Sequence, residues 1–283
     1  MRAALATLVL AFASVACAGS SSGRSGEETQ ALTAFYPLAF VAREVGGERV
    51  DVTNLTASGA EPHDLELTSG EIRSLAGADV FFWLGGGFQP AVEDVVDELD
   101  GAVDVLEGLP GARAGDPHVW LDPVLMRSVA ERVTDRLRAA DPAGADVYET
   151  RAEALESKLR ALDDDFSEGL SDCWQRAFVT SHDAFSYLAH RYDLEQIGIA
   201  GVDPEAEPTP QSVLAAARFA RDNDVTTIFY ERLVSPRIAQ AVADEVGVST
   251  AVLDPLEIGP ERGDYLSVMR DNLDALSHAL GCE

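Results

Sequence analysis

The sequence has little positive charge. Only 21 of its 283 residues are Lys or Arg, against 49 Asp and Glu, and the formal net charge is −28. Because nucleic-acid binding needs a basic face, this shortage argues against a nucleic-acid partner. The acidic residues are scattered along the chain, which is typical of a solvated, soluble surface.

Long hydrophobic runs are also scarce, and the one at the N-terminus is too short to span a bilayer. Met1-Arg2 and the apolar residues 3–16 predict a signal peptide of the lipoprotein type, with Cys17 as the lipidated first residue of the mature chain. Ser14 departs from the branched aliphatic residue usual in such a signal, so plain secretion is the alternative. Residues 17–28 are rich in Ser and Gly and predict a flexible tether.

Cysteine is rare as well, and only Cys173 and Cys282 follow Cys17. Export places them in a compartment that permits disulfides, so we expect the two to be bridged. A metal role is less favoured, because neither has a Cys or His partner at ligand spacing.

Five histidines are present, and three of them lie where an apolar run meets a polar turn: His63, His118 and His182. Neutral imidazole is the commonest protein ligand for divalent transition metals. Three imidazoles from separate loops and one carboxylate would make a closed four-coordinate site. The other two, His190 and His278, fall within helical patterns and are expected at the surface or in packing.

Apolar strand-like runs alternate with helical patterns along the chain, which predicts parallel sheets in an α/β fold. The first half has expected strands at 31–35, 50–55, 80–84 and 103–106 and helices at 37–45, 68–76 and 123–140. The second half has strands at 177–180, 195–199, 227–230 and 250–253 and helices at 183–192, 210–223, 236–246 and 263–280. We therefore expect two lobes, each with a four-stranded, mainly parallel sheet.

One long helical pattern connects the halves at residues 143–170. Its apolar residues step by four and three along a single stripe, at Tyr148, Ala152, Leu155, Leu159, Leu162, Phe166 and Leu170. A helix of this length reaches on the order of 40 Å, about the length of a domain pair. We expect metal-binding lobes at 29–142 and 171–283, bridged by this helix, although a helix packed on one lobe alone would show the same spacing.

The candidate ligands follow strands. His63, His118 and His182 come after the strands at 50–55, 103–106 and 177–180, and Asp254 ends the strand at 250–253. In parallel α/β sheets, ligands bind beyond the carboxyl ends of the strands. These four residues, two from each half, are therefore predicted to meet in a cleft between the lobes.

Several short motifs carry a family resemblance in combination. They are Glu61-Pro62-His63-Asp64, Asp116-Pro117-His118-Val119-Trp120-Leu121-Asp122-Pro123, Ser181-His182-Asp183-Ala184-Phe185, Pro204-Glu205-Ala206-Glu207-Pro208, Phe229-Tyr230-Glu231 and Leu253-Asp254-Pro255-Leu256. In this order and spacing, the chain resembles the metal-receptor subunits of bacterial ABC importers for zinc and manganese, the cluster A-I solute-binding proteins. The resemblance spans nearly all of the expected mature chain.

The resemblance implies two α/β lobes bridged by a long helix, with one metal ion in the cleft on His63, His118, His182 and Asp254. It implies a receptor rather than an enzyme, exported and lipid-anchored in the periplasm or at the outer face of the membrane. Its expected partner is the membrane permease of an ABC importer, with a metallochaperone as a further candidate, and we expect a monomer.

The resemblance also bears on the metal. Manganese receptors of the family usually have Glu at the position of His182, so histidine here favours Zn²⁺, one per chain, with Mn²⁺ as the alternative. Imidazole suits zinc, whereas manganese prefers oxygen ligands. Many zinc receptors carry a His-rich loop before the second histidine, but residues 85–116 contain no histidine.

Acidic residues beside the candidate ligands are expected to accept hydrogen bonds from the free imidazole N–H groups. The motifs offer Asp64, Asp122, Asp183 and Glu231 for this. Asp122 is equally suited to cap the helix that begins at Pro123. Glu61 is a candidate for a fifth ligand, a water-mediated contact or a turn-stabilising carboxylate.

Two other classes of protein compete with a receptor. A zinc hydrolase would use three protein ligands and one open position, but no H-E-x-x-H helix occurs and no Ser-centred nucleophile turn stands out. An adhesin or structural lipoprotein would use the metal only for folding and would unfold without it. The number of ligands and the stability of the metal-free chain separate these alternatives.

Overall fold

A computed structural model describes residues 28–232 and 235–283. The expected signal peptide, the lipidation site Cys17 and all but the last residue of the expected tether lie outside the described residues. No helix in the described part is long and apolar enough to cross a membrane.

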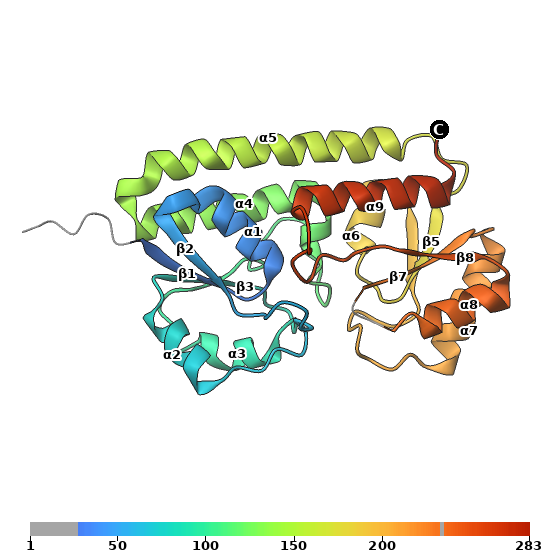
Figure 1. Cartoon of the computed structure of the whole chain (residues 1–283), viewed down its shortest axis with the longest axis horizontal. Helices are drawn as coiled ribbons and strands as arrows, with labels where there is room; N and C mark the ends of the chain where they lie inside the picture. Colours follow the sequence, from blue (N-terminus) through green and yellow to red (C-terminus); the bar gives the residue numbers. More distant parts are fainter. Residues whose placement is uncertain (1–27, 233–234) are drawn as a thin grey trace, which may run out of the picture.

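Two four-stranded parallel sheets form the framework, as predicted (Figure 1). The first sheet has the order β2-β1-β3-β4, with β1 (Thr29–Thr33), β2 (Val50–Asn54), β3 (Val80–Trp83) and β4 (Ala102–Asp104). The second has the order β6-β5-β7-β8, with β5 (Ala177–Thr180), β6 (Glu195–Gly198), β7 (Thr227–Tyr230) and β8 (Ser249–Val252). Each sheet and the helices around it are called the N-terminal and the C-terminal lobe.

Helices cover both faces of the first sheet. On one side lie α1 (Tyr36–Gly46) and α4 (Pro123–Ala140), and on the other α2 (Ser69–Gly77) and α3 (Pro90–Val96) (Figure 1). The capping box expected from the sequence starts α2: the hydroxyl of Thr68 accepts a hydrogen bond from the backbone N–H of Glu71, and the carboxylate of Glu71 accepts one from the backbone N–H of Thr68. The short helix α3 was not predicted, because seven residues give too little periodicity to read.

The C-terminal lobe carries α6 (Ser186–Arg191), α7 (Pro210–Asp222), α8 (Arg237–Val246) and α9 (Tyr265–Leu280). Helix α6 is shorter than the predicted 183–192, because the residues after β5 form a loop before the helix starts. His190 and His278 are exposed on α6 and α9, in keeping with a surface role.

The long helix α5 (Ala145–Gly169) runs along the top of both lobes (Figure 1). It packs against α1 and α4 of the N-terminal lobe and against α9 of the C-terminal lobe. The buried residues of α5 are those of the predicted stripe: Tyr148, Leu155, Leu159, Leu162 and Phe166. At 1.5 Å per residue the helix is roughly 37 Å long, enough to bridge both lobes. The lobe boundaries drawn at 142/143 and 170/171 stay a prediction.

A single large apolar core extends through both lobes by way of these helices and includes Phe35, Trp120, Phe166, Phe178 and Tyr265. A smaller core lies in the C-terminal lobe around Val179, Ile228 and Val242. The expected disulfide between Cys173 and Cys282 joins the segment after α5 to the segment after α9. The lobes are therefore held together by a continuous core along one side.

Candidate metal centre

His63 lies in the irregular segment between β2 and α2, and its side chain is 9% exposed. Its ring stands edge-on to Phe88, with ring centroids 4.5 Å apart. The turn before it is held by Gln89, whose side-chain amide donates to the carbonyl of Pro62 at 3.0 Å. The backbone N–H of His63 donates to Oε1 of Glu61 at 3.2 Å. These contacts point the ring into the space between the lobes.

His118 lies after β4, at the start of a 3-10 turn (Val119–Leu121), and its side chain is fully buried. Its Nδ1 lies 2.9 Å from Oδ1 of Asp116, which also accepts from the backbone N–H of His118 at 3.1 Å. The turn is anchored across the cleft, because Nε1 of Trp120 donates to the carbonyl of Pro255 at 2.7 Å. With Nδ1 held by the carboxylate, Nε2 is free to bind a metal.

His182 follows β5 and is also fully buried. Its Nδ1 lies 2.6 Å from Oε1 of Glu231, a carboxylate that follows β7 and also accepts a hydrogen bond from the hydroxyl of Ser181. The hydroxyl of Thr180 fixes the local turn by donating to the carbonyl of His182 at 2.6 Å. Nε2 of His182 therefore points away from Glu231 and toward the other histidines.

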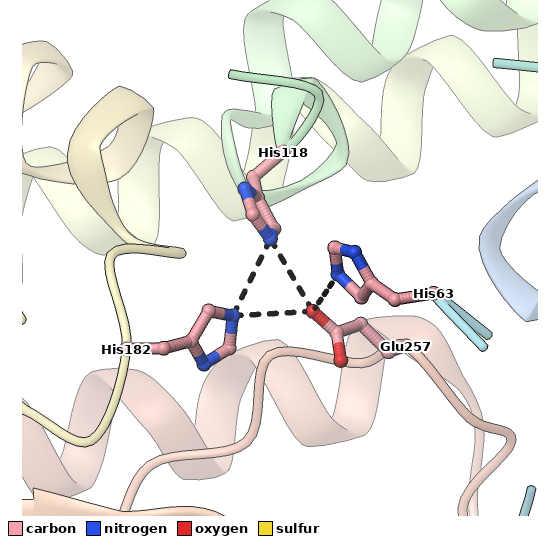
Figure 2. A group of neighbouring side chains, drawn as sticks. All are labelled: His63, His118, His182 and Glu257. Atoms are coloured by element: carbon pink, nitrogen blue, oxygen red, sulfur yellow. Dashed lines mark hydrogen bonds and ion pairs between the residues drawn. The ribbon is translucent and has the colours of Figure 1, made fainter. Parts of the chain in front are cut away.

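The carboxylate that joins the three imidazoles belongs to Glu257 (Figure 2). Its Oε1 lies 3.5 Å from Nε2 of His63 and 3.3 Å from Nε2 of both His118 and His182. The Nε2 atoms of His118 and His182 are 3.4 Å apart. Zinc bonds of about 2.0–2.2 Å in a tetrahedron leave ligand atoms roughly 3.3–3.6 Å apart. Four of the six separations in this group thus fit one small tetrahedral ion, and all its ligand atoms lie within 4.8 Å of one another.

Asp254, the carboxylate expected from the sequence, is directed elsewhere. Its Oδ2 lies 3.2 Å from Nε of Arg232, and its Oδ1 accepts from the backbone N–H of Leu256 at 2.8 Å. Leu256 has a φ of 59°, in the left-handed region that non-glycine residues rarely adopt. The residue after this turn, Glu257, is the one that lies beside the histidines.

The other acidic residues expected near the ligands have separate contacts. Asp122 caps α4 through Val124 and Leu125 and also pairs with Arg191 at 2.8 Å. Asp183 accepts from the backbone N–H of Gly198, and Asp64 is exposed. Of the five expected acids, Glu231 is the one whose carboxylate meets a histidine ring nitrogen in the described part of the chain.

Two acidic residues of the site were missed by sequence reasoning. Asp116 stands two residues before His118 in the same motif, so its proximity could have been inferred from the turn at Pro117. Glu257 lies three residues beyond Asp254, with the left-handed backbone of Leu256 between them, and no feature of the sequence shows which of the two carboxylates lies beside the histidines.

Burial and charge oppose each other at these groups. Burial disfavours the charged form of His182, but the carboxylates of Glu231 and Glu257 outweigh it and raise the pKa of the ring to about 10. Burial is likewise outweighed at His118, where Asp116 and Glu257 raise the pKa. Burial would raise the pKa of Glu257, yet the three imidazoles around its carboxylate hold it well below the ordinary value. The site is thus built to hold positive charge around one carboxylate.

A further carboxyl group, that of Glu61, lies close to the candidate ligands and has a shifted pKa. Burial, reinforced by the negative charge of Glu257, raises the pKa of its carboxyl to about 8. Its hydrogen bond from the backbone of His63 fits the expected turn-stabilising role.

The chain matches the family model described as zinc-uptake complex component A, periplasmic, over residues 32–279. It is 33% identical over 93% of its length to the zinc-binding lipoprotein AdcA of Streptococcus pneumoniae, of which the match covers 57%. It is 30% identical over 98% of its length to the high-affinity zinc uptake system protein ZnuA of Bacillus subtilis, of which the match covers 97%. The chain thus spans little more than half the length of the streptococcal AdcA proteins.

Solved structures agree in fold. The Zn(II)-bound ZnuA-like domain of Streptococcus pneumoniae AdcA is 33% identical, with a TM-score of 0.78 over 90% of this chain and 99% of that one. The laminin-binding protein of Streptococcus agalactiae, described as having adhesin and metal transporting activity, is 31% identical, with a TM-score of 0.84 over 90% of this chain and 100% of that one. From the extent of these matches and the shared architecture, we conclude that the chain belongs to the zinc-uptake complex component A family.

Proposed function

We propose that this chain is an extracytoplasmic receptor that captures Zn²⁺ as its cargo and delivers it to the permease of an ABC importer. The observation that supports this most is the group formed by His63, His118, His182 and Glu257, whose shortest separations match those of a tetrahedral zinc site. The zinc-binding names of the relatives support the same conclusion.

Zinc is favoured over manganese by the donor set. Three imidazole nitrogens and one carboxylate oxygen suit zinc, whereas manganese prefers more oxygen ligands. Bound Zn²⁺ with three neutral imidazoles and the carboxylate of Glu257 would carry a net charge of +1. The nearby carboxyl of Glu61 can compensate for it when ionised.

Capture is favoured over catalysis because four protein side chains are available to one ion. Catalytic zinc sites usually keep a position open for water, whereas four protein ligands close the coordination. His118, His182 and Glu257 are also buried, which leaves little room for a substrate. We therefore propose that the chain has no zinc-dependent hydrolase activity.

Capture is also favoured over a purely structural use of the metal. The apolar core joins the lobes, and the disulfide closes the C-terminal lobe, without any contribution from the four candidate ligands. We expect the metal-free chain to stay folded, as a receptor that must reload requires. A structural site would instead make folding depend on the metal.

The remaining expectations are part of the same proposal. The chain would be anchored at the membrane through lipid on Cys17, act as a monomer and contact a permease, with a metallochaperone as a further donor of zinc. Metal analysis of the chain from about residue 27, with competitive titration of Zn²⁺ and Mn²⁺, tests the central point. One tightly bound Zn²⁺ per chain is expected. Absence of metal binding, or preference for Mn²⁺, would contradict the proposal.

A further inference from the structure

The carboxylate beside His118 is shared between the two lobes. One oxygen of Asp116, Oδ1, accepts from the backbone N–H and Nδ1 of His118, both in the N-terminal lobe. The other oxygen, Oδ2, accepts a hydrogen bond from the hydroxyl of Ser186, the first residue of α6 in the C-terminal lobe. The orientation of one candidate ligand is therefore set by groups from both lobes.

The neighbouring contacts hold the backbone of Asp116 independently of that hydroxyl. The phenol of Tyr187 donates to the carbonyl of Asp116 at 3.0 Å and accepts from the backbone N–H of Arg113 at 2.5 Å. A second link between the lobes joins Arg191 to Asp122 at 2.8 Å. Removing the hydroxyl of Ser186 should therefore leave the lobes and the backbone of Asp116 in place. It frees one carboxylate oxygen and removes the 3.4 Å contact between Nη1 of Arg113 and the same hydroxyl.

We infer that Ser186 is a positioning residue through which the C-terminal lobe holds His118, a ligand from the N-terminal lobe, in its zinc-binding orientation. The inference rests on the proposed function, because it assumes that zinc binds to Nε2 of His118. A carboxylate fixed at both oxygens cannot rotate away from Nδ1, so the ring keeps its Nε2 directed at the metal. Separation of the lobes would break the hydrogen bond from Ser186 to Asp116, and the imidazole of His118 would then be held less firmly. Retention of zinc would therefore depend on contact between the two lobes.

The chain supplies a matched control within one lobe. Ser181, Glu231 and His182 form a similar group of hydroxyl, carboxylate and imidazole in which both donors contact the same oxygen, Oε1 of Glu231, and all three belong to the C-terminal lobe. The two serines should act through different carboxylates, so their effects can be separated by double-mutant cycles.

The test measures zinc affinity and the rate of zinc release to a chelator in the mature chain. Ser186→Ala is expected to weaken affinity by on the order of tenfold, because a hydrogen bond to a charged carboxylate is lost. In an Asp116→Ala background, which by itself should cost about 10–100-fold, Ser186→Ala should have no further effect. Ser181→Ala should keep its full effect in that background, and Ser186→Thr should restore binding by returning the hydroxyl.

The outcomes separate the inference from the function on which it rests. The role of Ser186 would be overturned if the Ser186→Ala chain bound zinc with wild-type affinity. It would also be overturned if Ser186→Ala weakened zinc affinity equally in the wild-type and Asp116→Ala backgrounds. Loss of the effect in the Asp116→Ala background and rescue by Thr would support it. Failure of the wild-type chain to bind zinc would instead contradict the proposed function. Thermal unfolding of the metal-free variants identifies any chain that fails to fold. If Ser186→Ala is such a chain, the zinc affinities of Ser186→Thr, which keeps a hydroxyl, and Ser186→Gly, which lacks one, are compared instead.

Discussion

Nε2 of His118 and Nε2 of His182 lie 3.4 Å apart, although the two residues are 64 positions apart in the sequence and belong to different lobes. Each ring turns its Nδ1 to a carboxylate, Asp116 for His118 and Glu231 for His182. The two Nε2 atoms therefore face each other across the cleft, and Oε1 of Glu257 lies 3.3 Å from both. A cation placed between them could bind both Nε2 atoms and Oε1 of Glu257.

Replacement of Glu257 should weaken zinc binding far more than replacement of Asp254. Glu257→Ala removes the carboxylate that lies among the histidines and should reduce affinity by about 100-fold or more, beyond the usual cost of losing a supporting group. Asp254→Ala removes a group paired with Arg232 and should change affinity by less than about tenfold. Competition with a chromophoric chelator measures both. A larger loss of zinc affinity in Asp254→Ala than in Glu257→Ala would show that Asp254, and not Glu257, is the ligand.

His182→Glu should shift the metal preference from Zn²⁺ toward Mn²⁺. The substitution converts three nitrogens and one oxygen into two of each, and manganese binds oxygen ligands more readily than zinc does. The new carboxylate would also face Glu231 and Glu257, so binding of any divalent ion should become more dependent on pH. Competitive titration with both metals measures the shift. An unchanged selectivity would show that His182 does not determine the choice.

Zinc binding should release protons and weaken as the pH falls. His182 has a pKa raised to about 10 in the metal-free chain, so it is protonated at neutral pH and must lose that proton to bind zinc. Each displaced proton weakens affinity about tenfold per pH unit below that pKa, and zinc should leave the site as the pH approaches about 5.

The protons released on zinc binding can be assigned to His182 by experiment. Titration calorimetry in two buffers of different ionisation enthalpy gives the number of protons released at pH 8. Glu231→Gln should lower this number, because the negative charge beside His182 is the strongest influence that raises its pKa. Zinc binding with no proton release in the wild-type chain would contradict the assignment.

Removal of the disulfide should lower stability without altering the metal site. Cys173 and Cys282 close a loop with a sequence separation of 109, for which the chain-entropy model gives about 4–5 kcal/mol of stabilisation. The double variant Cys173→Ser/Cys282→Ser should therefore lower the free energy of unfolding by up to that amount, measured by urea denaturation under oxidising conditions. Its zinc affinity should match that of the wild-type chain, which serves as the control. A loss of zinc binding in the folded variant would show that the bridge also positions the lobes.

Much of the architecture followed from local signals. Buried strands such as Val80–Trp83 are continuous apolar runs, and Thr68 with Glu71 gives the capping box that starts α2. The seven residues of α3 were too few to show a helical period. The start of α6 was misplaced because the loop after His182 has the composition of a helix start.

The sequence by itself determined the alternation of strands and helices, the long bridging helix and the three histidines, because strand ends in a parallel sheet collect at one edge. The tertiary structure alone decided which carboxylate joins them. Asp254 and Glu257 both follow β8, and with the left-handed backbone of Leu256 between them Asp254 pairs with Arg232 and Glu257 lies beside the histidines. The contact of Ser186 with Asp116 could not be predicted from the sequence either. The two residues are 70 positions apart and belong to different lobes, so the contact depends on how the lobes pack together.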